Sequence, residues 1–406
     1  KKMLLYINIC TDLFKIIIGL GNHNKIIHKT LMPHAIQDNQ TFNHNIVKIY
    51  NTIAYLHLQT NPLLSIYYHY KSYKLCLKGN QTPQNILKTL AEHTIILSKL
   101  GLKKISYSIL ESIIDTAKNA DYYNIYGYAL LIKAIFLDYP CLKDDEISEQ
   151  IHNALRNISP NEDRIAFTIG VIFHLYRELI KGKPQKALKI AKIIPDIIPT
   201  RNHLNAKAMA IVFYTYLLSD SRDSIVKLGE LYIKRRQAVA ARPDDMFIRI
   251  INTIITFAKG EIEKTRTYYS SVIKDFINSK QETLFLPFLQ DFIFLFAHTL
   301  PALFEQEYGR QIMRNSELKP LWILLNKKLN KTYTKNTAVI KLVKARTKEL
   351  LKHKNIKILY DEALIQSKTS GYYLIQAFSY LWFGNYLLNL GYKKRINYIF
   401  KVYYFS

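Results

Sequence analysis

The chain has 406 residues, of which 49% are hydrophobic, and a formal net charge of +26. This apolar content is enough for a sizeable core and excludes a largely disordered chain, while 13 glycines and 12 prolines are too few for a turn-rich β fold. The charge has two open explanations. One is an anionic partner, such as nucleic acid or a membrane surface. The other is the coding bias of an AT-rich genome, which would also explain the 30 tyrosines.

The cysteines and the apolar runs indicate where the protein resides. Cys10, Cys76 and Cys141 are widely separated and form no CxxC pair, so we expect no disulfide framework and a cytoplasmic location. The N-terminal apolar run is followed by no cleavage site of a signal peptide. The other apolar run, Leu284–Phe304, contains Asp291. Because a mid-membrane Asp costs about 2.5–3.5 kcal/mol, we predict a buried helix there and no transmembrane segment.

Residues 1–45 form the least regular part of the chain. We predict one helix over Met3–Leu20, followed by a polar loop that contains four histidines, namely His23, His28, His34 and His44. Their spacings do not place pairs on one helical face, and no HExxH motif is present. We therefore interpret them as solvated loop residues and predict no metal site.

From Ile46 onward the helical pattern is nearly continuous. Helices are predicted over Ile46–Gln59, Leu63–Leu77 and from Thr82 to Leu100, with proline at the first position of the last two. Apolar residues recur at helical spacing after Gly101. Ser159–Glu162 has the sequence of a capping box, which predicts that Ser159 caps a helix over Arg164–Ile180.

Turn signals recur about every forty residues, within the range of periods that indicates a helical repeat array. Three are the glycine turns at Gly101, Gly182 and Gly260, since glycine readily adopts the left-handed conformation that ends a helix. Weaker breaks are Pro140–Leu142, Ser219–Ser221 and Leu300–Pro301. These signals predict an all-α fold, a right-handed α-solenoid of TPR-like helix hairpins. The predicted parts are an irregular N-terminal segment (1–45), the repeat array (46–310) and C-terminal helical repeats (311–406).

The C-terminal part is predicted to contain helices over Leu318–Leu329 and Thr337–Leu351, in a stretch rich in lysine. Clustered cations can bind phosphates without further specificity. The candidate anion or partner contacts are Lys341, Lys344, Arg346, Lys348 and Lys352. A solvated helix face explains the same residues. The basic run Lys234–Arg236, near the end of another helix, is interpreted as complementing the helix dipole.

No motif in the sequence indicates catalysis. The glycines include no phosphate-binding GxxxxGK[ST] loop, and neither GxSxG nor the kinase motifs occur. The acidic clusters Asp144–Glu146 and Asp244–Asp245 each precede a helical segment, where acids stabilise the first turn. We therefore expect no enzymatic activity, no catalytic residue and no cofactor.

The segment Leu359–Tyr404 is similar to the last repeats of the TPR-like region in large bacterial signalling proteins. These proteins join a serine/threonine-kinase-like domain, a STAND AAA-type ATPase, a TPR-like array, a GAF domain and a sensor histidine kinase. The resemblance rests on Tyr360, Asp361, Ala363, Gly371, Tyr372, Gln376, Ala377, Tyr386, Gly391 and Tyr403–Tyr404. Upstream, Thr60–Leu63 and Lys78–Asn80 are similar to the start of the family's array. The resemblance thus extends from about Leu31 to the end.

The chain departs from the family pattern at Ile396 and Val402, and after Phe405–Ser406 no GAF domain follows. The resemblance implies a fragment that holds the array alone. It would be a non-catalytic scaffold that binds a protein partner, an effector or the neighbouring ATPase and kinase domains. Two alternatives stay open. One is a basic module for nucleic acid or an anionic membrane surface, and the other is a peptide-sensing TPR-type regulator, for which no convincing helix-turn-helix is present.

Overall fold

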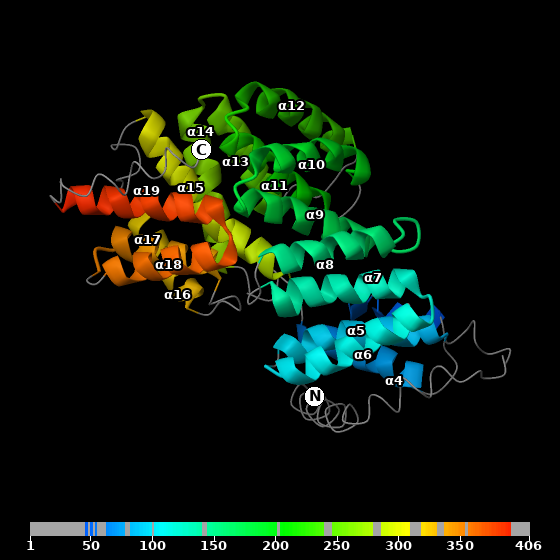
Figure 1. The fold of residues 1–406 in the computed structure, drawn as a ribbon. Helices are drawn as coiled ribbons and strands as arrows, with labels where there is room; N and C mark the ends of the chain where they lie inside the picture. The colour runs from blue at the N-terminus through cyan, green and yellow to red at the C-terminus, as the bar shows by residue number, and fades with distance from the viewer. Residues whose placement is uncertain are drawn as a thin grey trace, which may run out of the picture. The chain divides into compact units, whose positions relative to one another are not determined.

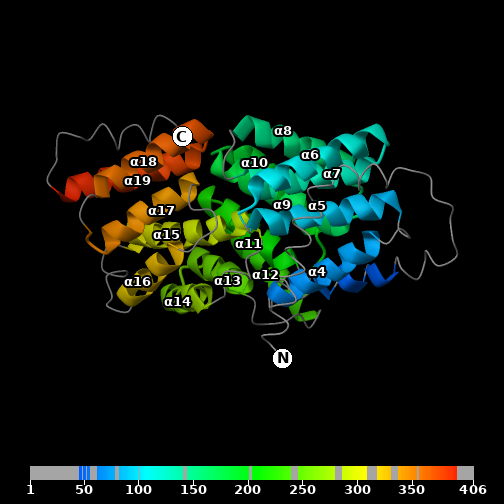
Figure 2. The same ribbon diagram turned by 90° about the horizontal axis from the view of Figure 1, so that it is seen from below.

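The structure is a computed structural model, in which every described regular element is a helix (Figure 1, Figure 2). The described residues are 45–47, 49–51, 53–54, 62–77, 82–99, 101–139, 144–200, 204–238, 246–278, 286–308, 318–330, 337–353 and 356–390. The all-α prediction is confirmed for these ranges. The predicted N-terminal helix, the histidine loop, Pro140–Leu142 and the segment after Leu390 lie outside them.

The helices follow one another with short turns. In chain order they are α4 (Pro62–Leu77), α5 (Pro83–Lys99), α6 (Lys103–Asn119), α7 (Tyr123–Ile132), the π-helical η1 (Lys133–Asp138), α8 (Asp144–Asn157), α9 (Arg164–Ile180), α10 (Pro184–Ile197), α11 (Asn205–Leu218), α12 (Arg222–Ala238), α13 (Met246–Ala258), α14 (Ile262–Asn278), α15 (Pro287–Tyr308), α16 (Leu318–Leu329), α17 (Ala338–Leu350), α18 (Ile356–Ser370) and α19 (Tyr373–Asn389). The predicted bounds of α9 and α16 agree with these, and the bounds of α4, α5 and α17 agree within one residue at each end.

The chain divides into two compact units. Unit 1 comprises Lys1–Tyr139, Glu149–Phe167 and Lys280–Leu286, and unit 2 comprises Pro140–Ser148, Thr168–Ser279 and Pro287–Ser406. In unit 1, α4 packs on α5, α5 on α6 and α6 on α7. The predicted glycine turns are present in both units, because Gly101, Gly182 and Gly260 all have positive φ.

Helix α9 begins differently from its prediction. The capping residue is Asp163, whose Oδ1 accepts a hydrogen bond of 3.1 Å from the backbone N–H of Ala166. Ser159 instead begins a turn, in which its carbonyl accepts from the N–H groups of Glu162 and Asp163. The capping-box prediction was therefore wrong about the residue, although the helix is present. Asp163 also forms an ion pair with Lys88 of α5 at 2.5 Å, which an uncharged serine cannot form.

Helix α15 forms the centre of unit 2. It is buried over most of its length, which confirms the predicted buried helix, and it is also long and apolar enough to cross a bilayer, with 89% of that apolar window buried. Aromatic contacts reach it from several helices. Phe173 of α9 packs on Phe288 at a ring-centroid distance of 5.0 Å, and Phe257 of α13 packs on Phe304 at 4.8 Å.

The break predicted at Leu300–Pro301 was wrong, because both residues lie inside α15. Proline has no N–H, so the carbonyl of Ala297, four residues earlier, loses its partner within the helix. The hydroxyl of Tyr269 in α14 donates a hydrogen bond of 2.6 Å to this carbonyl. A side chain of a neighbouring helix thus replaces the missing backbone donor, which explains why the helix continues through the proline.

A buried charged junction joins α9 to α19 within unit 2. Arg177 of α9 is fully buried, and its Nη1 donates a 2.7 Å hydrogen bond to the hydroxyl of Tyr372, which lies 195 residues further along the chain. Next to it, Lys181 donates to Ser148 at 2.5 Å and to Glu178 at 3.4 Å. A repeat array in which each unit touches only its neighbours has no such contact. Unit 2 therefore includes packing between helices far apart in sequence.

Candidate functional site

The predicted anion contacts are distributed over two sides of α17. Lys341, Lys344 and Lys348 are three and four residues apart, which places them on one helical face, and Lys352 follows the helix in a turn with φ of 57°. Lys341 Nζ lies 3.5 Å from the side-chain oxygen of Gln366 in α18. The structure therefore brings these lysines to one side of α17 and separates them from Arg346.

Arg346 points into unit 2. Its side chain is only 12% exposed and pairs with Glu349 at 2.8 Å and with Glu305 of α15 at 3.9 Å, while its guanidinium carbon lies 5.6 Å from the centre of the Trp382 ring. Burial alone would lower the pKa of Arg346, but the charge of Glu349 and its hydrogen bond raise the pKa above its usual value. The charged guanidinium thus serves packing within the protein.

Lys328, in the same lysine-rich stretch, also has an internal partner. Its Nζ donates to the carbonyls of Phe276 and Ile277 at the end of α14 and lies 4.7 Å from the centre of the Phe276 ring. Burial lowers the pKa of Lys328 to about 8. A cation on the last carbonyls of a helix stabilises its dipole. The lysines of the α17 face are then the part of the predicted cluster that stays accessible to an anion.

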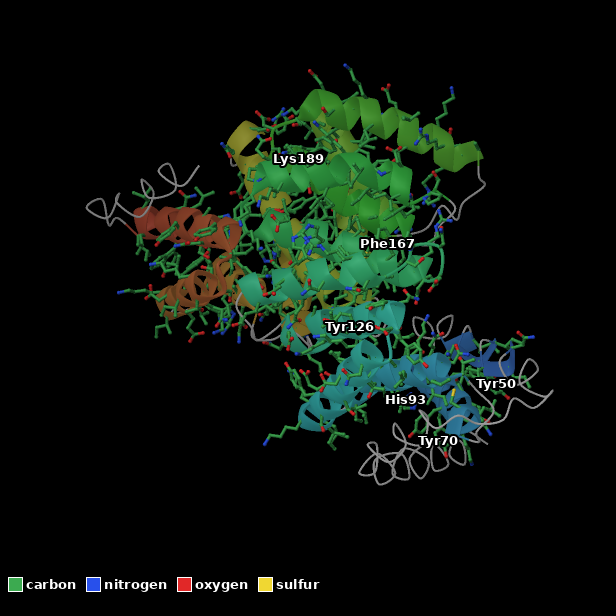
Figure 3. The ribbon with its side chains drawn as sticks, turned by 45° about the vertical axis from the view of Figure 1, so that its right-hand side comes forward. Tyr50, Tyr70, His93, Tyr126, Phe167 and Lys189 are labelled. Atoms are coloured by element: carbon green, nitrogen blue, oxygen red, sulfur yellow. The ribbon has the colours of Figure 1, made fainter. Side chains whose placement is uncertain are left out.

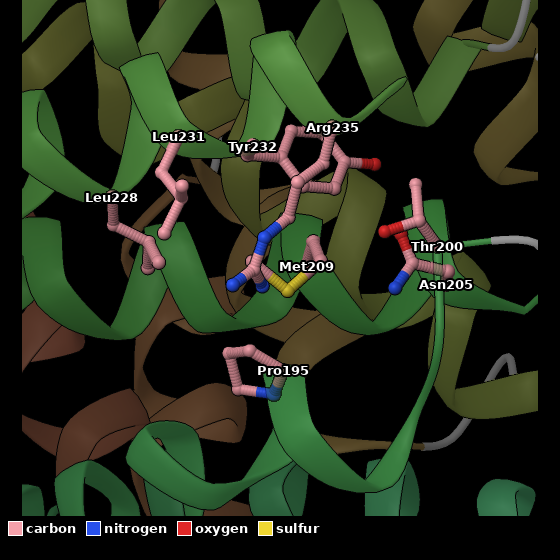
Figure 4. Close-up of a pocket in the computed structure, with 8 residues that line it drawn as sticks. All are labelled: Pro195, Thr200, Asn205, Met209, Leu228, Leu231, Tyr232 and Arg235. Carbon is pink, nitrogen blue, oxygen red and sulfur yellow. The ribbon is translucent and has the colours of Figure 1, made fainter. Parts of the chain in front are cut away.

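A surface pocket lies within unit 2, where α10, α11 and α12 meet (Figure 4). It holds about 260 Å³ of space open to solvent and is lined by Pro195, Thr200, Asn205, Met209, Leu228, Leu231, Tyr232 and Arg235. In Figure 4 the leucines lie on one side and Thr200 and Asn205 on the other. The arrangement combines an apolar wall, one cation and a polar end.

Three contacts hold the α12 side of this pocket in place. Gly229 allows α12 to approach α13, since a Cβ on it would lie 2.7 Å from Cδ1 of Ile255. Tyr232 is 5% exposed, packs edge-on against Phe213 with 6.0 Å between ring centres, and accepts a 3.3 Å hydrogen bond from Arg236. The lining residues of α12 are therefore fixed by packing beneath them.

The polar groups of the pocket are incompletely paired. Asn205 is buried, and its Nδ2 donates to the Ile198 carbonyl at 2.8 Å, but its Oδ1 has no hydrogen-bond partner in the described part of the chain. Arg235 is exposed and has no acidic partner among the described residues. The sequence predicts Arg235 near the end of a helix, which the structure confirms. The pocket itself is missed at the level of sequence, because helical spacing does not reveal which helices meet.

A separate polar cluster lies inside unit 1. His93 of α5 stacks on Tyr73 of α4 at 4.5 Å between ring centres, and Nδ1 of His69 lies 3.7 Å from Oε2 of Glu92 (His93 is labelled in Figure 3). Burial lowers the pKa of His93 to about 3, and burial also lowers the pKa of His69. In the described ranges no three His, Cys, Asp or Glu side chains are arranged to hold a metal ion.

The comparisons with known proteins give no assignment. No family model matches the sequence, and no curated protein matches it. The proposed function therefore rests on the residues of this chain.

Proposed function

We propose that this chain is a non-catalytic scaffold that binds a protein partner. Its elements would be TPR-like helix hairpins that form a right-handed solenoid with a period near forty residues, as in the helical region of bacterial signalling ATPases and kinases. Several observations support the proposal. Consecutive helices pair in both units, and residues with positive φ separate many of them, at Gly101, Asp121, Gly182, Asp220, Gly260, Lys352 and Gly371.

The pocket between α10, α11 and α12 is the observation that carries the proposal. The interior of unit 2 is filled by α15, whose side chains are buried over most of its length. The pocket offers a leucine, Leu231, which is 44% exposed, beside Arg235, for which the described part of the chain supplies no acidic partner. Arginine is enriched among the residues that contribute most binding energy in protein interfaces, which favours this pocket as the contact.

The test is a quantitative capture experiment from a lysate of the source organism, with the purified chain as bait. Leu231→Glu should abolish capture of the partner, because it places a charge on the apolar wall of the pocket. Ile365→Glu is the matched control, since Ile365 is an apolar residue of α18 with 64% exposure, and it should leave capture unchanged. Equal capture by all three baits, or no specific capture by any of them, would contradict the proposal.

A second function is favoured by the α17 lysine face. Arg346 forms ion pairs with the nearby acids Glu305 and Glu349, so these acids do not neutralise Lys341, Lys344 and Lys348. We propose that these lysines bind a polyanion such as nucleic acid. Reversing the three charges should lower retention on immobilised DNA and flatten its salt dependence, because fewer counterions are released. Unchanged retention would rule this face out as the site.

A further inference from the structure

We infer that the pocket between α10, α11 and α12 recognises a peptide segment in which an apolar side chain is followed closely by a carboxylate. This inference rests on the proposed function and specifies the chemistry of the partner. Three features of the lining lead to it: the size of the pocket, its single charge and its unpaired amide oxygen.

The size favours one side chain over a small-molecule ligand. Pockets for small molecules usually enclose about 300–1,000 Å³ and cover most of the ligand. The pocket here encloses only about 10 Å³, room for about one water molecule, and the rest of its roughly 260 Å³ is open to solvent. Its wall consists of Leu228, Leu231 and Met209, with Pro195 opposite. The pocket is therefore a shallow depression, and an apolar side chain of a bound peptide would lie across these carbon atoms, whereas a small-molecule ligand would remain mostly exposed.

The positive charge in the pocket lining favours a peptide that carries a carboxylate close to its apolar side chain. Arg235 is the one charged residue in the lining, and no acid lines the pocket. The adjacent Lys234 and, two turns earlier, Lys227 are exposed on the same helix, so the local potential is positive. Arginine binds carboxylates through two parallel hydrogen bonds, which also fixes their orientation. A peptide carboxylate one or two residues from the apolar side chain that lies on this wall could reach this guanidinium.

The polar end favours a peptide backbone. Oδ1 of Asn205 is a buried acceptor that has no partner among the described residues, and Asn205 lines the pocket. A backbone N–H of an extended segment, directly or through a bridging water, supplies the missing donor. Because Tyr232 and Gly229 pack α12 closely against α11 and α13, the backbone positions of its lining residues are set before binding, which lowers the ordering cost.

The experiment is a selection from random heptapeptides displayed on phage, with the full chain immobilised. Wild type should enrich sequences with an apolar residue followed within two positions by Asp or Glu. Arg235→Glu should shift the enriched charge from acidic to basic. For a selected acidic peptide, its dissociation constant should rise about fivefold or more, as expected for loss of an exposed ion pair and its replacement by repulsion. Lys227→Glu makes the same charge change on α12 outside the lining and should retain the acidic motif.

The outcomes separate this inference from the function on which it rests. A motif that is unchanged by Arg235→Glu, or that lacks either the apolar or the acidic residue, would overturn the recognition proposed here while leaving peptide or protein binding in place. If no peptide is enriched and the chain also captures no partner, both the inference and the proposed function fail. Circular dichroism of each variant confirms that the helices are retained.

Discussion

At the scale of single residues, Tyr269 and Pro301 act as a pair. The Tyr269 hydroxyl donates to the Ala297 carbonyl, which proline leaves without its helical partner. Tyr269→Phe should lower the free energy of unfolding by about 1–3 kcal/mol, the cost of an unsatisfied buried acceptor. In a Pro301→Ala background the loss should be smaller by at least about 0.5 kcal/mol, since the alanine supplies the backbone N–H that proline lacks. Denaturant titration of the four proteins measures this coupling.

The control for this cycle is Tyr232→Phe, which removes a hydroxyl that accepts from Arg236. Its effect should add to that of Pro301→Ala without coupling. Equal losses for Tyr269→Phe in both backgrounds would show that the hydroxyl does not replace the missing backbone donor.

At Gly127, helices α7 and α8 come close together in unit 1. A Cβ there would lie 2.7 Å from the backbone oxygen of Ala154 in α8. In an exposed helix, Gly→Ala stabilises by about 1 kcal/mol, but here the clash with backbone should reverse the sign and destabilise by about 1–3 kcal/mol. Gly229→Ala is the comparison, because its Cβ would lie 2.7 Å from Cδ1 and 2.8 Å from Cγ1 of Ile255, a side chain that can change rotamer, whereas the Ala154 backbone cannot. Thermal unfolding should therefore show a larger loss for Gly127→Ala, and a gain there would contradict the close packing.

At the scale of elements, the buried junction ties the α18–α19 hairpin to α9. Burial raises the pKa of the Tyr372 hydroxyl. The positive charge of Arg177 lowers this pKa, and the negative charge of Asp291 raises it further. Arg177→Met removes the donor of the buried hydrogen bond to the Tyr372 hydroxyl, and leaving a buried polar group without its partner typically costs about 1–3 kcal/mol. Hydrogen exchange should accelerate first in α18 and α19. Lys357→Met, which removes an exposed cation near the start of α18, should change exchange little.

The result that would contradict this account is a uniform loss of protection from α9 to α19 in Arg177→Met. The junction would then be part of one cooperative core, and the α18–α19 hairpin would not open as a separate unit.

At the scale of the whole molecule, buried histidines should set the response to acid. Burial lowers the pKa of His93 and of His298 to about 3, against about 6.5 in the unfolded chain. The unfolded state therefore binds protons first as pH falls, so stability is fully present above pH 6.5 and is lost towards pH 3. Each histidine contributes about 4 kcal/mol over this window. Urea titrations between pH 7 and pH 4 measure the slope of the free energy of unfolding against pH.

His298→Gln should flatten this slope for unit 2, because the imidazole that contacts Phe294 and Thr347 no longer titrates. His152→Gln, at an exposed position of α8, should leave it unchanged. An unaltered acid slope in His298→Gln would show that this imidazole is not the group responsible.

The sequence predicts the helices well and their spatial relations poorly. Apolar periodicity gave the bounds of α9 and α16, since those signals are local. Both Ser159 and Asp163 are good capping residues, and only the contact with Lys88 distinguishes them. Likewise, Pro301 predicts a break in the helix, and only the position of the Tyr269 hydroxyl at the Ala297 carbonyl explains why the helix continues. Arg346 and its lysine neighbours look alike in sequence, but only Arg346 has Trp382 and two acids beneath it. The pocket depends on three helices meeting, which no local pattern encodes.

The central claim, that the chain binds a protein partner through the pocket on α12, can be tested in the cell. A photo-crosslinking amino acid at Leu231 should give one dominant covalent adduct with a second protein, because this side chain borders the pocket and is 44% exposed. The same amino acid at Ile365, an exposed apolar site of α18, should give none. No adduct at Leu231, or equal adducts at both positions, would contradict the claim.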